Sequence, residues 1–203
     1  MKRVHYFSGG IISLFVGLHL LNHLYSVFGI SAHLELMDSL RVVYRNVFAE
    51  SMLFFALVIQ IFSGIPLFLR KRKTAAGFFE KMQSWTGLYL AFFLVVHVSA
   101  VLSGRLLLNL DTNFYFGAAG LNTFPLNLFF IPYYGLAIMS FFGHISAVHS
   151  LKMKYSLLGI TPIKQSYLIL ALGITVTLII LYGLTDGLHG VEIPREYDVI
   201  IGK

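Results

Sequence analysis

Five long apolar runs, separated by short polar segments, decide what this chain can fold into. They lie at residues 7–29, 47–69, 84–104, 127–150 and 166–185. A helix that crosses the hydrocarbon core of a bilayer needs about 20 such residues, because each adds about 1.5 Å. A helix also satisfies its own backbone hydrogen bonds, as lipid demands. We therefore predict an all-α integral membrane protein, a five-helix transmembrane bundle in which residues 1–203 form a single domain.

The composition indicates that this chain is surrounded by membrane lipid and that it does not bind nucleic acid. Only 12% of the residues are charged and 57% are hydrophobic, whereas a soluble domain carries about 25% charged residues. The net charge of +6 does not indicate nucleic-acid binding, because the basic residues form short blocks between apolar runs. Cysteine is absent, which excludes disulfides, thiolate metal sites and cysteine nucleophiles.

The basic residues also predict the orientation of the bundle. Five spans place the termini on opposite sides, and lysine and arginine favour the cytoplasmic side. One side collects ten basic residues and the other collects five, namely Arg41, Arg45, Arg105, Arg195 and Lys203. We expect a multi-pass protein of a bacterial inner (plasma) membrane, with a cytoplasmic N-terminus and an external C-terminus.

Two segments between spans show structure of their own. Residues 32–45 carry apolar side chains at helical spacing, which predicts a short surface helix in the first outer loop. The loop 105–126 is long and aromatic, and we expect it to pack as a cap over the outer end of the bundle.

Two histidines fall at the same depth in separate spans. His19 lies twelve residues beyond Phe7, and His97 lies twelve beyond Trp85, so each is about 18 Å into its helix. Both helices run outward, which brings the two imidazoles to matching heights. His23 shares a face with His19, one turn nearer the outer surface.

These histidines have two interpretations. Interhelical hydrogen bonds in membranes are weak, on the order of 0.6 kcal/mol, and the imidazoles would then only hold helices together. Ionisable groups at mid-membrane are rare and usually functional, and two at one depth favour ligation. His144 lies in the inner half of the fourth run. The remaining histidines are expected at surfaces or near an interface: His5, His33, His149 and His189.

Two imidazoles facing each other across an apolar bundle suit one prosthetic group in particular. Carboxylates and thiols are missing nearby, so a closed zinc site does not fit. A b-type heme supplies four of its own iron ligands and needs only His19 and His97, with His23 as the alternative ligand on the first helix. With both axial positions filled, the chemistry is electron transfer. We expect the heme carboxylates to point outward, towards Tyr25, Arg41, Arg45 or Arg105.

Several motifs resemble the membrane-anchor cytochrome b subunit of succinate dehydrogenases and fumarate reductases, in its single-subunit, five-helix form. They are GLHLLNH in the first run, MQSWTGLYLAFFLVVHV in the third and GHISAVHS in the fourth. The resemblance implies heme b, quinone as electron partner, and flavoprotein and iron–sulfur subunits as protein partners. It places a quinone site near Gln83, Ser84 and Trp85, and makes this chain at most the non-catalytic membrane subunit of a quinone oxidoreductase.

The second run departs from that family's pattern. Where the family has HxxxG, this sequence reads QIFSG, with Gln60 in the histidine position. An amide is a poor iron ligand, so His144 lacks a ligand partner and the resemblance supports one heme, the outer one. A bond between His144 and Gln60 is the expected replacement.

A second function, from another class, remains open. A heme-free membrane protein can reuse this fold, with the histidines and Gln60 in interhelical bonds and the outer loops binding a lipid or a partner. No Ser-His-Asp arrangement and no phosphate-binding loop appears in the sequence, so neither hypothesis includes a catalytic centre in this chain.

Overall fold

A computed structural model describes all residues, 1–203, and shows an all-α protein without a β-sheet. Five helices are long and apolar enough to cross a membrane. These five are α1 (Lys2–Leu24), α3 (Val47–Lys71), α4 (Phe78–Leu106), α6 (Asn127–Lys152) and α7 (Pro162–Leu184). The short elements are the 3-10 turn η1 (Tyr25–Phe28), α2 (Ile30–Tyr44), α5 (Phe114–Ala118), η2 (Arg195–Tyr197) and α8 (Asp198–Ile201).

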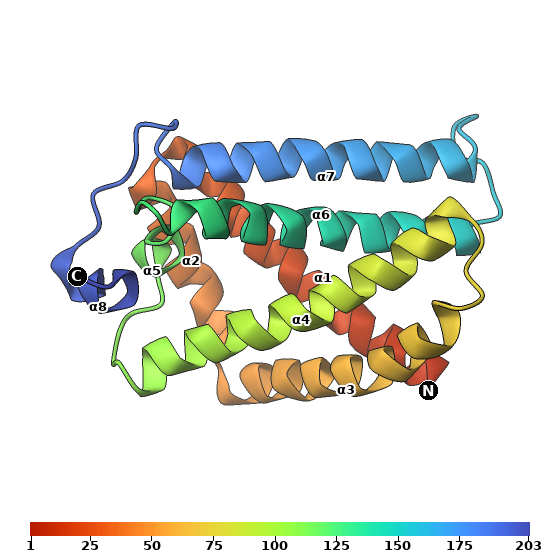
Figure 1. Cartoon of the computed structure of the whole chain (residues 1–203), viewed down its shortest axis with the longest axis horizontal. Coiled ribbons are helices and arrows are strands. Elements are labelled where there is room, and N and C mark those ends of the chain that lie inside the picture. Colours follow the sequence, from red (N-terminus) through yellow and green to blue (C-terminus); the bar gives the residue numbers. More distant parts are fainter.

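The long helices form a ring. α1 packs on α3, α3 on α4, α4 on α6 and α6 on α7, and α7 closes the ring against α1 and η1. Figure 1 shows α6 and α7 side by side, α3 at the opposite edge, and α1 and α4 crossing the space between them. The two termini lie at opposite ends of the long axis (Figure 1), as five spans require.

Local sequence signals fix where these helices begin. The Asn46 side chain accepts a hydrogen bond from the Phe48 amide at 3.0 Å and so caps α3. Glu80 reaches back to the amides of Ala76 and Gly77, at 3.0 and 3.2 Å, and so satisfies donors at the start of α4. α7 begins with Pro162, which has no amide hydrogen to leave unpaired.

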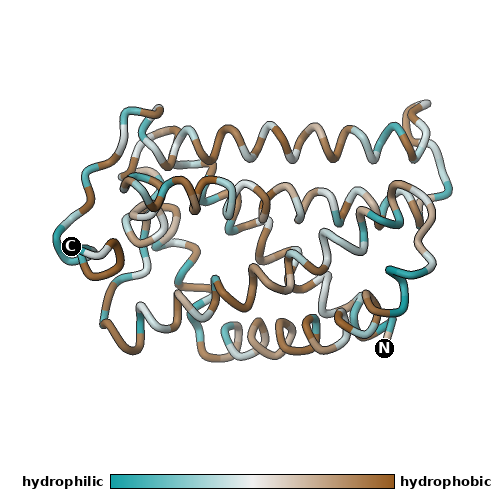
Figure 2. The backbone as a smooth tube through the Cα atoms, in the orientation of Figure 1, coloured by the Kyte–Doolittle hydropathy of each residue, from teal (hydrophilic) through white to brown (hydrophobic).

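The five predicted spans are confirmed, although the helices extend beyond them. α4 begins at Phe78, six residues before the predicted span, because Glu80 caps a turn that precedes the apolar run. α1 begins at Lys2, five residues before the predicted span. Polar residues gather at the two ends of the bundle and apolar residues line the helices between them (Figure 2).

The two segments between spans that were expected to have structure of their own, residues 32–45 and 105–126, both contain a helix. α2 covers the predicted surface helix. The loop 105–126 contains α5 and packs as a cap, because Phe114, Ala118 and Leu121 are buried in one apolar cluster with residues of α1, α6 and α7. The main core of the protein therefore sits beneath this loop, at the end of the bundle that we call the outer end because of its predicted orientation.

The C-terminal segment is fastened to the cap by side chains that are far away in sequence. Tyr197 is 0% exposed, and its hydroxyl lies 2.9 Å from both the Asp111 carbonyl and the Asn113 side-chain oxygen. Burial raises the pKa of the Tyr197 phenol, which keeps it protonated and able to donate. Asn122 accepts from the Val191 amide at 3.0 Å.

We expect Tyr197→Phe to loosen this segment by about 1 kcal/mol, because the phenol's hydrogen bonds are lost while its packing is kept. Trypsin cleavage after the neighbouring Arg195 in detergent-solubilised protein should become faster. Tyr182→Phe is the matched control, since Tyr182 is 51% exposed and donates no hydrogen bond. Equal cleavage rates in all three proteins would contradict this account of the tail.

Candidate functional site

His19 of α1 and His97 of α4 face each other inside the ring. Their ring centroids are 6.2 Å apart, with an interplanar angle of 63°. The predicted juxtaposition of these two side chains is confirmed. Each imidazole also stacks on a phenylalanine one turn earlier on its own helix: Phe15 lies 5.9 Å from His19, and Phe93 lies 5.0 Å from His97. These rings hold both histidines in position.

The two helices that carry the histidines meet through side chains. The backbones of α1 and α4 are not among the closely packed helix pairs of the ring, and neither are those of α1 and α6. His19 and His97 both keep part of their surface accessible although they lie mid-way along their helices. The two imidazoles therefore meet where α1 and α4 approach each other without close backbone packing.

The spacing of this pair fits two axial ligands on one metal ion. Imidazole–metal bonds are about 2 Å long, so two rings on opposite sides of one ion have centroids about 6 Å apart. No group of three or more histidine, cysteine or acidic side chains is arranged to hold a metal ion. These two histidines could therefore supply at most two ligands to a metal ion.

A row of imidazoles continues from this pair towards the outer end. Nε2 of His23 lies 3.1 Å from Nε2 of His19, and the His23 ring is 5.3 Å from that of His33 in α2. Asn22 donates to Nε2 of His33 at 3.2 Å. Three buried polar atoms in this row have no partner: Oδ1 of Asn22, Nδ1 of His23 and Nδ1 of His33. The row therefore holds polar atoms without a hydrogen-bond partner beside His19 and His97.

The expected surface position of His33 is wrong. Its side chain is 1% exposed, because α2 folds against the bundle and turns His33 inward to Asn22. Burial, with a smaller contribution from the nearby imidazole of His19, lowers the pKa of His33 to about 4. His33 is therefore neutral at pH 7.

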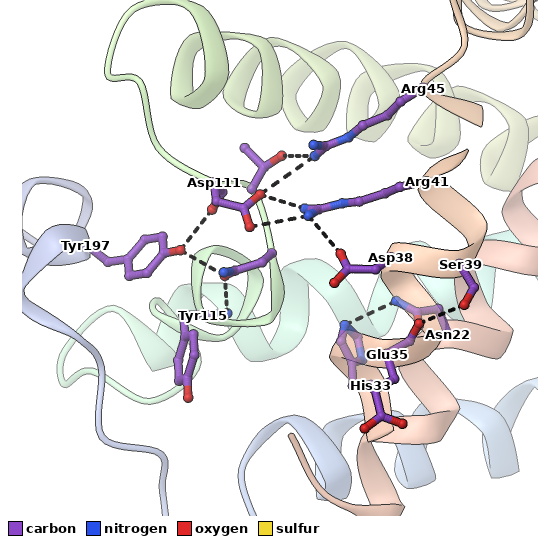
Figure 3. Close-up of polar contacts among 12 residues, drawn as sticks. Asn22, His33, Glu35, Asp38, Ser39, Arg41, Arg45, Asp111, Tyr115 and Tyr197 are labelled. Atoms are coloured by element: carbon purple, nitrogen blue, oxygen red, sulfur yellow. Dashed lines mark hydrogen bonds and ion pairs between the residues drawn. The ribbon is translucent and has the colours of Figure 1, made fainter. Parts of the chain in front are cut away.

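The arginines at this end are paired with acids, and Figure 3 shows Arg41 and Arg45 beside Asp111. Arg41 contacts both carboxylate oxygens of Asp111, at 2.8 and 3.3 Å, and Arg45 donates to Thr112 at 3.1 Å. Arg105 pairs with Glu50 at 2.5 Å and links the outer ends of α3 and α4. These pairs hold the cap in place and engage the side chains of all three arginines.

Gln60 does not bond to His144, and the expected replacement contact is wrong. Gln60 instead accepts from Ser8 at 2.6 Å and donates to Nε2 of His5 at 3.2 Å, while Nδ1 of His5 donates to Ser63 at 2.9 Å. These four residues join α1 to α3. The reason is geometric, since α1 and α3 are neighbours in the ring and the α3 and α6 spans are not.

His144 is satisfied by α4. Its Nδ1 lies 3.1 Å from the Gln83 carbonyl and 3.3 Å from the Thr86 hydroxyl. A Cβ at Gly87 would lie 3.0 Å from the His144 ring, so this glycine gives the imidazole room between α4 and α6. His149 bonds to Gln165 at 2.7 Å, and His189 is exposed.

Sequence reasoning missed His5 as a partner for Gln60. His5 precedes the first apolar run, so it was assigned to the surface, yet α1 extends back to Lys2 and carries it inward. The signal that was available is the spacing of His5 and Ser8, which fall on one helix face three residues apart.

The fold and the site together define a class: an all-α bundle of five membrane-length helices with a pair of facing histidines. Comparison with known proteins adds no name to this class, since no family model, curated protein or solved structure matches the chain.

Acidification should destabilise the outer end through His33. Its folded-state pKa of about 4 lies below the ordinary value of about 6.5, so the unfolded state gains the proton first as pH falls. The contribution of neutral, buried His33 to the unfolding free energy is complete above about pH 6.5 and is lost progressively as the pH falls to about 4. Lowering the pH from 7 to 5 should reduce the unfolding free energy of both proteins. We expect the reduction to be smaller in His33→Asn than in the wild type, by about 2 kcal/mol.

Chemical denaturation in detergent at both pH values measures this difference. His189→Asn is the control, because His189 is exposed and its removal should leave the wild-type pH dependence unchanged. A His33→Asn protein as acid-sensitive as the wild type would refute the assignment.

Proposed function

We propose that this protein is a membrane-anchor, cytochrome b-like subunit that holds one heme b and exchanges electrons with quinone. The observation that carries the proposal is the 6.2 Å separation of the His19 and His97 rings across the bundle. His23 is the alternative ligand on α1. A bound heme would supply one-electron transfer, and His19 and His97 would hold its iron.

In this proposal, the residues around His19 and His97 orient the two imidazoles and surround the heme. Phe15 and Phe93 stack on the two imidazoles and keep their rings oriented. The unsatisfied atoms of Asn22, His23 and His33 can donate to or accept from polar groups at the outer edge of the site. Burial by α2 and the cap keeps bulk water away from that edge, which tunes a redox centre.

Quinone is proposed as the electron partner because it dissolves in the bilayer. Support comes from the polar and aromatic side chains where α3 and α4 meet at the basic end: Lys71 donates to Gln83, and Trp85 packs edge-on against Phe68 at 5.5 Å. Flavoprotein and iron–sulfur subunits are proposed as further partners on the strength of the motif resemblance alone.

The inner half of the bundle offers no second ligand pair in this proposal. Gln60 occupies its amide in contacts to Ser8 and His5, and His144 is oriented by the Gln83 carbonyl. Heme stoichiometry of one per chain is therefore expected.

A heme-free scaffold is the second candidate. It is favoured by the contact between Nε2 of His19 and Nε2 of His23 at 3.1 Å, which engages the atom that would ligate iron. In that case the histidine row only joins α1 to α2 and α4, and the outer loops bind a lipid or a partner.

The reduced-minus-oxidised absorption spectrum of protein purified from heme-replete cells tests the first proposal. We expect a b-type band in the wild type and its loss in His19→Ala and in His97→Ala, because each imidazole would supply one of the two protein ligands to the iron. His144→Ala and His149→Ala are matched controls that should keep the band. A colourless wild-type preparation, or a band that survives both single substitutions, would favour the scaffold.

The proposed membrane and orientation are a bacterial inner membrane with a cytoplasmic N-terminus. The absence of cysteine allows a clean test with Lys73→Cys and Lys203→Cys, which lie at opposite ends of the bundle. A membrane-impermeant maleimide should label Lys203→Cys in intact cells and Lys73→Cys only after permeabilisation, because basic loops stay cytoplasmic. The reverse labelling pattern would invert the proposed topology.

A further inference from the structure

We propose that a groove on α1, at the basic end of the bundle, binds an anionic phospholipid. One acyl chain lies over Gly10, and the lipid phosphate meets the ammonium of Lys152. The inference does not depend on the heme proposal.

The groove follows the membrane-facing side of α1. Its volume is about 460 Å³, and its lining consists of Tyr6, Phe7, Gly10, Ile11, Ser13 and Leu14. A Cβ at Gly10 would meet nothing within 4 Å, so no other helix covers this part of α1. Phe7 and Leu14 are 71% and 70% exposed. An apolar groove on an uncovered helix face can accommodate a hydrocarbon chain.

A fixed positive charge marks the end of the groove. Nζ of Lys152, from the C-terminus of α6, lies 4.2 Å from the centroid of the Tyr6 ring, and Tyr6 lines the groove. This cation–π contact restrains an otherwise flexible side chain. Lys2 and Arg3 lie on the preceding turn of α1 and are exposed. Lys152 forms no salt bridge with any acidic side chain, so its charge is available to a phosphate.

The whole basic end attracts anions. Ten lysines and arginines lie there, with a single acid, Glu80, whose carboxylate is engaged by the amides that it caps. The ten are Lys2, Arg3, Arg70, Lys71, Arg72, Lys73, Lys81, Lys152, Lys154 and Lys164. Basic residues beside a membrane surface bind anionic headgroups with about 1 kcal/mol for each residue.

These features favour a lipid over other occupants of the groove. A soluble acidic protein would contact the basic loops but would not place hydrocarbon along α1 below them. A second, parallel copy of this chain would bring one basic end against another, and like charges repel. In an anionic phospholipid, the acyl chain can fill the groove while the phosphate contacts the ammonium of Lys152.

Electron paramagnetic resonance of spin-labelled lipids tests the site. The full-length protein is reconstituted in phosphatidylcholine vesicles, and the motionally restricted fraction of labelled phosphatidylglycerol is compared with that of labelled phosphatidylcholine. We expect about a fivefold preference for phosphatidylglycerol, the effect of one well-placed cation. Lys152→Met should reduce this preference to near unity, and Gly10→Leu should reduce it by filling the groove.

Two variants serve as matched controls. Lys154→Met removes an exposed lysine two residues away, and Gly17→Leu fills a glycine position on the same helix that is equally uncovered but lies outside the groove. Both should keep the wild-type preference, and the helical circular dichroism of all four variants should match the wild type. Equal restriction of the two lipids by the wild type would overturn the proposal. A loss in Lys154→Met equal to that in Lys152→Met would do the same, as it indicates a diffuse basic surface. So would an unchanged preference in Gly10→Leu combined with a changed oligomeric mass, since a second copy would then cover the groove.

Discussion

The need to pair every polar group that enters lipid governs how this bundle is assembled. An apolar helix has no preferred side in a bilayer, because lipid tails are as apolar as leucine. Polar side chains therefore determine which side of each helix faces its neighbours. Ser8 and His5 turn α1 towards Gln60 and Ser63 of α3, and His144 turns α6 towards the Gln83 carbonyl of α4. The ring of helices follows from these few contacts together with the apolar core under the cap.

Charge is distributed differently at the two ends of the bundle. At the outer end, Arg41, Arg45 and Arg105 contact Asp111 and Glu50, and the acids outnumber the bases. These pairs fix the cap and join the end of α4 to the start of α3. At the other end, ten bases face one acid, so most of the positive charge is left for partners outside the chain. One end of the protein is therefore closed by internal contacts, whereas the other is suited to anionic surfaces.

The sequence predicted the spans, the surface helix, the cap and the juxtaposition of His19 with His97, because each depends on a periodic or a depth relation within a single helix. It did not predict which helices are neighbours. The expected bond from Gln60 to His144 failed for that reason, as did the surface assignments of His5 and His33. His5 was misplaced because a helix can begin before its apolar run, and His33 because a surface helix can fold one face onto the bundle. Ring order and helix rotation arise from tertiary packing, which periodicity does not encode.

Hydrogen-bond accounting separates the histidines that hold the fold together from those that are available for another task. A neutral imidazole has one donor and one acceptor. His5 uses both nitrogens, and the donor of His144 is directed at a backbone carbonyl. These two residues are explained by structure alone. His97 takes part in no hydrogen bond with any protein group, although it lies at mid-membrane, where an unpaired polar group costs several kcal/mol by order of magnitude. In the heme proposal, His97 would bond to the iron together with His19, whose ring lies 6.2 Å away.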